Sequence, residues 1–155
     1  MDYTLMKLIH IISAIILLAM GLVGAIYCWQ NHEEPDLQVR KLAISSVIRT
    51  NWLFVTPALV LQLITGWSLM RSMALGFTTT WLNLTLMLYG VVCILWCAMV
   101  WLQISMVNTL KVALSENKDS KLTSYHTYYQ YWLYLAVPTL TIVIIIFYLM
   151  IFKPA

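Results

Sequence analysis

The sequence predicts an all-α integral membrane protein, a four-helix bundle formed by one domain of residues 1–155. Of the 155 residues, 62% are hydrophobic and only 10% are charged, and the mean hydropathy is +0.84. A water-soluble domain of this length could not cover so much apolar surface, so lipid must act as the solvent. Four segments are long enough to cross about 30 Å of hydrocarbon; they comprise residues 5–29, 52–70, 81–107 and 131–152.

The first segment, 5–29, is predicted to be a retained transmembrane helix rather than a cleaved secretory signal. Ala19, Met20 and Gly21 offer small residues of the kind found near signal cleavage sites. The apolar run nevertheless continues beyond them to Trp29, and the acidic Asp2 precedes the only early cation. These features favour a helix that stays in the membrane.

The second segment, 52–70, is predicted to continue a helix that begins in the preceding connection, QNHEEPDLQVRKL. Pro35 and Asp36 are typical helix-start residues there. Pro57 lies inside this segment and Pro138 inside the fourth, and a proline at such a position removes a backbone hydrogen bond and can bend the helix. The following connection, RSMALGFTTT, is short, so the second and third helices are expected to be antiparallel neighbours.

The third segment, 81–107, is predicted to project beyond the membrane into the polar link LKVALSENKDSKLTSYH, and the fourth, 131–152, returns across it. Tryptophan and tyrosine are enriched where helices meet the membrane surface. Residues of these two types near the ends of the segments are Trp29, Trp52, Trp81, Tyr128, Tyr129 and Trp132.

The distribution of lysine and arginine predicts the orientation, because cytoplasmic links carry the excess of these residues. The first and third links share one side of the membrane and hold Arg40, Lys41, Arg49, Lys111, Lys118 and Lys121. The opposite side has only Lys7, Arg71 and Lys153. We therefore expect a multi-pass protein of the bacterial inner membrane with both termini on the periplasmic side. The net charge of +3 is scattered rather than clustered, which argues against a nucleic-acid partner.

One histidine, His10, lies within the first segment. At about 100° per residue it shares a stripe with small residues, and the members of that stripe are His10, Ala14, Leu17, Gly21, Gly24 and Cys28. Small residues let neighbouring helices approach closely, so His10 is expected to face the interior of the bundle. A facing polar stripe on the second segment comprises Asn51, Gln62 and Thr65, with Gly66 at its edge.

These residues together supply what a haem site would need, with His10 as the candidate axial metal ligand. A porphyrin needs an imidazole for the iron, space between helices, and cations near its propionates. Lys7 and Arg71 lie at similar depth on the outer side and can supply those cations. The predicted cofactor-binding residues are His10, Lys7, Arg71, Gly21, Gln62 and Thr65.

Other interpretations remain open. An interior transmembrane histidine is more often hydrogen-bonded to a neighbouring helix than bound to a metal. His32 and His126 belong to the opposite side, so neither can share an iron with His10. The chain can instead be a non-catalytic accessory subunit that packs against other membrane subunits or a second copy. A weaker alternative is copper handling through His10, methionines and Cys93 with Cys97. We identify no nucleophile–base pair and no phosphate-binding loop, so no catalytic residue is predicted.

Four stretches carry a family resemblance that covers nearly the whole chain: LMKLIHIISAIILLAMGLVGA, NWLFVTPALVLQLITGWSLM, TWLNLTLMLYGVVCILWCAMVWLQISM and YYQYWLYLAVPTLTIVIIIFYLMIFKP. They resemble bacterial four-span integral membrane proteins that share a domain of unknown function. The shorter KLIHIISAI and the pair Thr65-Gly66 also resemble HemJ-type protoporphyrinogen oxidases and CopD-like membrane proteins. The HemJ resemblance implies haem b bound through a first-helix histidine, which matches His10. That family also has a lysine near the start of its third helix, where this chain has Asn83 and Thr85, so the resemblance does not extend to catalysis.

Overall fold

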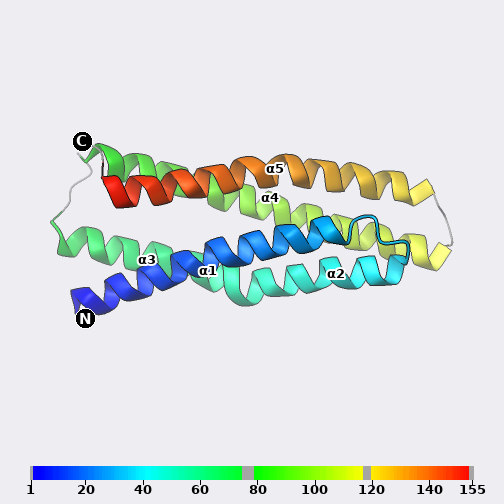
Figure 1. Ribbon diagram of the computed structural model, residues 1–155, viewed down its shortest axis with the longest axis horizontal. Helices are drawn as coiled ribbons and strands as arrows, with labels where there is room; N and C mark the ends of the chain where they lie inside the picture. The colour runs from blue at the N-terminus through cyan, green and yellow to red at the C-terminus, as the bar shows by residue number, and fades with distance from the viewer. Residues whose placement is uncertain (1, 75–78, 117–119, 154–155) are drawn as a thin grey trace.

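The computed structural model describes residues 2–74, 79–116 and 120–153, and these residues form a long helical bundle (Figure 1). Four helical stretches are long and apolar enough to cross a membrane, as predicted. The elements are α1 (Tyr3–Gln30), α2 (Leu37–Thr50), the π-helical turn η1 (Asn51–Val55), α3 (Thr56–Ser72), α4 (Thr80–Glu116) and α5 (Ser120–Phe152). Helix α1 begins and α5 ends at the same end of the bundle, which we call the terminal end; the opposite end is the link end (Figure 1).

Helix α2 begins where the sequence predicted. The side chain of Asp36 caps it, because Oδ1 accepts a hydrogen bond from the backbone N–H of Gln38 at 2.7 Å. The helix then continues through η1 into α3 without a break, which gives one helical stretch over Leu37–Ser72.

The π-helical turn η1 is a feature that the sequence did not predict. The backbone N–H of Thr56 bonds to the carbonyl of Asn51, five residues earlier, and its hydroxyl donates to the same oxygen at 3.1 Å. Pro57 follows directly; a proline donates no hydrogen bond and its ring clashes with the carbonyl four residues before it. The wider turn accommodates this proline. Pro138, in contrast, lies inside a continuous α5.

Two helices extend farther than their apolar segments. Helix α4 runs on to Glu116, as predicted, and α5 begins at Ser120, well before the predicted residue 131. Hydropathy locates only the part of a helix that lipid surrounds, whereas the helix itself continues into polar sequence. Of the cations used to predict the orientation, Lys118 and the side chain of Lys121 lie outside the described residues.

A cluster of buried residues lies toward the link end, between α1, α2, α4 and α5. It comprises Cys28, Ile44, Val47, Leu102, Met106, Val107, Leu110, Tyr125, Tyr129 and Trp132. The spans also expose large apolar side chains, such as Met87, Ile94 and Tyr134, at more than 70% of their surface. Lipid is as apolar as these side chains, so nothing drives them into the bundle.

Candidate ligand site at His10

His10 projects from α1 toward α3 and is half-buried between them. Its Nδ1 lies 2.8 Å from Oγ1 of Thr65, a residue of α3 that is only 2% exposed. The two helices pack against each other. The structure therefore brings together two of the predicted site residues across an interhelical hydrogen bond.

The hydrogen bonds of Thr65 determine which nitrogen of His10 carries the proton. Its Oγ1 lies 2.5 Å from the carbonyl of Leu61, one turn earlier on α3, and donates its single proton there. The hydroxyl can then only accept from His10, so we assign the imidazole proton to Nδ1. The opposite nitrogen, Nε2, is left with a lone pair and has no hydrogen-bond partner among the described residues.

The backbone of His10 is held as firmly as its ring. The carbonyl oxygen of His10 accepts two hydrogen bonds, one from Nε2 of Gln62 on α3 at 3.0 Å and one from Oγ of Ser13 at 3.0 Å. Gln62 and Thr65 therefore bind the same residue from one face of α3, as the predicted polar stripe implied. Ser13, which is 1% exposed, is a participant that the sequence analysis missed.

Gly66 provides the space that the imidazole occupies. A Cβ atom at this position would lie 3.3 Å from Cε1 of His10, which is closer than most real contacts of this kind. Any larger residue at position 66 would push the ring away from α3.

The small-residue stripe of α1 is only partly in the interior. Gly24 faces α2, since a Cβ there would lie 3.3 Å from Cγ1 of Val47, and Cys28 is buried. Gly21 is exposed, with no atom within 4 Å of where a Cβ would be. It also lies about 16 Å along α1 from His10, so the structure does not bring Gly21 to the His10 site.

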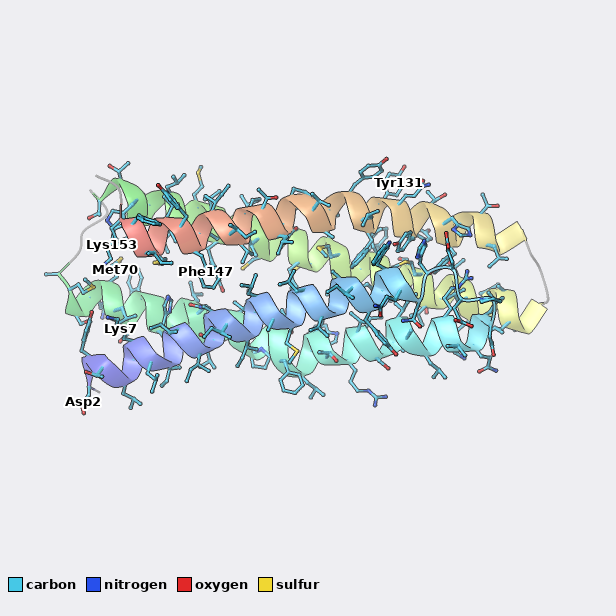
Figure 2. All side chains as sticks on the ribbon, viewed as in Figure 1. Asp2, Lys7, Met70, Tyr131, Phe147 and Lys153 are labelled. Carbon is cyan, nitrogen blue, oxygen red and sulfur yellow. The ribbon has the colours of Figure 1, made fainter. Side chains whose placement is uncertain are left out.

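The predicted cations both lie at the terminal end and are exposed. Figure 2 shows Lys7 there, together with Met70 and Lys153. The guanidinium of Arg71 lies 5.3 Å from the centre of the Trp67 ring, a cation–π distance. Lys7 and Arg71 are thus near the helix ends, where a charged head can reach water or an anionic group.

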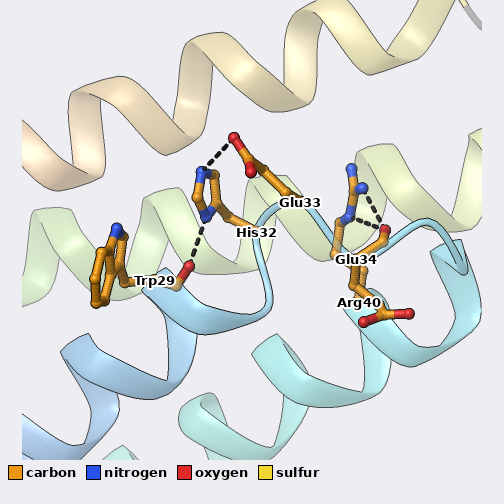
Figure 3. A network of polar contacts seen from close by, with 5 residues as sticks. All are labelled: Trp29, His32, Glu33, Glu34 and Arg40. Carbon is orange, nitrogen blue, oxygen red and sulfur yellow. Dashed lines mark hydrogen bonds and ion pairs between the residues drawn. The ribbon is translucent and has the colours of Figure 1, made fainter.

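His32 has a different role at the link end (Figure 3). Its Nδ1 bonds to the carbonyl of Trp29 at 2.5 Å, its Nε2 lies 3.4 Å from a carboxylate oxygen of Glu33, and its ring stacks on Tyr129. Both nitrogens are therefore engaged. Arg40, 6% exposed, donates from Nε and Nη2 to the carbonyl of Glu34. These contacts hold the connection between α1 and α2.

No group of three or more His, Cys, Asp or Glu side chains that could hold a metal ion occurs within the described ranges. The cysteines are free; Cys93 is half-buried and Cys97 is exposed on α4. A porphyrin iron needs only one protein ligand of this kind, so this observation bears on the copper interpretation and not on the haem one.

A second interhelical amide contact was missed by the sequence analysis. Nδ2 of Asn51, in η1, donates to Oε1 of Gln103 on α4 at 3.0 Å, and Gln103 is 2% exposed. The sequence could have indicated this contact, because Gln103 is an amide within a predicted transmembrane segment and such side chains hydrogen-bond to other helices.

The comparisons with known proteins agree with this architecture. No curated protein and no solved structure matches the chain. A family model described as "Predicted integral membrane protein (DUF2269)" matches residues 4–154. With its four membrane-length helices, the chain therefore belongs to the DUF2269 family of predicted integral membrane proteins.

Proposed function

We propose that this protein is a small redox-associated component of the bacterial inner membrane that binds haem b through Nε2 of His10, with both termini periplasmic. The observation that carries the proposal is the state of the His10 ring. Nδ1–H is bound to Thr65, which leaves the lone pair of Nε2 available. Histidine ligands of metals are generally fixed in this way, by a hydrogen bond to the nitrogen that does not bind the metal.

The surrounding residues fit an axial imidazole. Gln62 and Ser13 hold the carbonyl of His10, and Gly66 leaves room for its ring, so the imidazole has a fixed orientation. Lys7 and Arg71 at the same end of the bundle would pair with the propionates. Bound haem b would supply one-electron redox chemistry, while the chain supplies the ligand and its orientation.

The visible spectrum of the purified protein, expressed in cells supplied with haem precursors, tests the proposal. We expect a Soret band that is lost in His10→Ala, and a haem affinity about 10- to 100-fold weaker in Thr65→Val. His32→Ala is the matched control, since both nitrogens of His32 are engaged at the link end. A protein without a Soret band, or with one unchanged in His10→Ala, would refute haem ligation by His10. Copper that disappears in Cys93→Ala/Cys97→Ala would favour copper handling instead.

A second candidate is the role of accessory subunit in a larger membrane complex. It is favoured by Gly21 on α1 and Gly90 on α4, which are exposed and have no atom within 4 Å of where a Cβ would be. Such positions let the backbone of a partner helix approach closely. Purification in mild detergent tests this role: larger subunits should accompany the wild-type chain and be lost in Gly21→Leu. A single chain that purifies alone from its native membrane would count against it.

A further inference from the structure

A groove of about 210 Å³ lies between α2 and α4 toward the link end, far along the bundle from His10. It is separate from the proposed haem site and does not depend on it. Its lining residues are Ser45 and Ile48 from α2 and Ile104, Val107, Asn108 and Lys111 from α4.

The polarity of this groove changes along the axis of the bundle. Helix α2 runs from the link end inward and α4 runs outward (Figure 1). The polar lining residues Ser45, Asn108 and Lys111 therefore lie at the outer part of the groove, next to Val107, whereas Ile48 and Ile104 lie at the inner part. A phospholipid at the membrane surface has the same order, with a polar headgroup outside and acyl chains inside.

A pair of tryptophan residues lies on the inward side of this groove. Trp52, in η1, follows Ile48 by one turn, and its ring packs edge-to-face on Trp96 of α4 with the ring centres 6.0 Å apart. Tryptophan concentrates at the boundary between hydrocarbon and headgroups. Trp52 is one of the aromatic residues predicted at a span end, so the groove, which lies outward of it, is expected at headgroup level.

Basic side chains lie along the groove. Lys111 lines its outer part. On α2, Lys41 lies one turn outward of Ser45 and Arg49 lies one turn inward of it. In the parts of the chain that the structure describes, none of these three cations forms an ion pair with a carboxylate. Their charge is available to an anionic ligand.

We propose that this α2–α4 groove is a binding site for an anionic phospholipid. The phosphate lies at Lys111, Asn108 and Ser45, and one acyl chain follows Ile48 and Ile104 toward the tryptophan pair. Basic pockets between helices at the membrane surface recognise lipid headgroups in this way. A free phosphate would leave the apolar half of the groove unused.

Native mass spectrometry of the intact protein, released from nanodiscs, tests the site. We expect phosphatidylglycerol to be retained over phosphatidylcholine with the same acyl chains. Each cation near an anionic lipid contributes about five-fold in affinity, so Lys41→Gln/Lys111→Gln should weaken retention about 25-fold. Lys111→Arg should retain the lipid. The matched control is Lys7→Gln/Lys153→Gln, which removes the same charge at the terminal end and should leave retention unchanged.

The outcomes that would overturn the proposal are distinct. Equal retention of the two lipids would refute recognition of the anionic headgroup. An equal loss in the terminal-end control would show a general effect of net charge. Displacement of phosphatidylglycerol by millimolar inorganic phosphate or by the deacylated headgroup would identify an anion site with no role for the acyl chain. Circular dichroism of each variant verifies that a loss of lipid is not a loss of fold.

Discussion

Replacing Thr65 with valine tests the hydrogen bond on which the His10 site depends. Valine has nearly the shape of threonine, and Thr65 is only 2% exposed, so Thr65→Val removes the hydroxyl without opening a cavity. The loss leaves the imidazole N–H at Nδ1 without its 2.8 Å partner. Interhelical hydrogen bonds in membrane proteins contribute about 0.6 kcal/mol on average and up to about 1.7.

We expect Thr65→Val to lower the free energy of unfolding by about 1 kcal/mol. The value lies between those two figures because the Thr65 hydroxyl is enclosed while His10 itself is only half-buried. The loss of the bond to Leu61 adds little, since that carbonyl keeps its place in the backbone ladder of α3.

Thr85→Val is the matched control. Thr85 is also buried, at 3% exposure, but its hydroxyl donates only to the carbonyl of Trp81, one turn earlier on its own helix. Its replacement removes only a bond within one helix, so it should lower the free energy of unfolding by less than Thr65→Val does. The difference between the two variants isolates the bond that joins α1 to α3.

Unfolding in mixed micelles of mild detergent and dodecyl sulfate, followed by tryptophan fluorescence, measures both variants. A double-mutant cycle with His10→Phe should give a coupling energy of about 1 kcal/mol between His10 and Thr65. Equal destabilisation by Thr65→Val and Thr85→Val, together with a coupling energy of zero, would refute the assigned hydrogen bond.

Three further substitutions test other contacts. Gly66→Ala places a Cβ 3.3 Å from the imidazole of His10, so the nitrogen chemical shifts of His10 should change. Gly90→Ala is the control, because no atom lies within 4 Å of its Cβ, and the shifts should stay as in the wild type. Unchanged shifts in both variants would disprove the close approach. Arg40→Ala removes hydrogen bonds to a loop carbonyl and a cation–π contact 5.1 Å from an aromatic ring of α5, so it should cost about 2–3 kcal/mol in the same unfolding assay. The exposed Arg49→Ala should stay within about 0.5 kcal/mol, and a similar cost for both arginines would contradict a special role for the buried one. Gln103→Leu leaves the amide of η1 without its partner and should cost about 1 kcal/mol, so wild-type stability would show that this bond contributes nothing.

The sequence alone determined the features that depend on neighbouring residues. The positions of the four spans follow from hydropathy, because the free energy of transfer into lipid is a sum over the residues of one segment. The start of α2 at Asp36 follows from capping, which joins a side chain to a backbone group two residues away. The extension of α4 beyond its apolar part was also predicted from local sequence, because the residues that follow the apolar part are polar but can continue the helix.

Only the tertiary structure decided which side chains meet. In lipid, an apolar face gains nothing by turning inward, so periodicity could not show that Gly21 is exposed while Gly24 packs on α2. The early start of α5 was likewise decided by the tertiary structure, because α5 packs against α4 beyond the apolar segment of either helix.

The sequence placed His10 and Thr65 on plausible faces of two helices, but their bond joins residues 55 positions apart. It forms only when the rotation and depth of both helices are fixed by packing. The proton of Thr65 can then be traced to Leu61, and the free nitrogen of His10 follows from it. The candidate ligand atom, Nε2, is therefore a product of the fold, although the histidine that carries it was visible in the sequence.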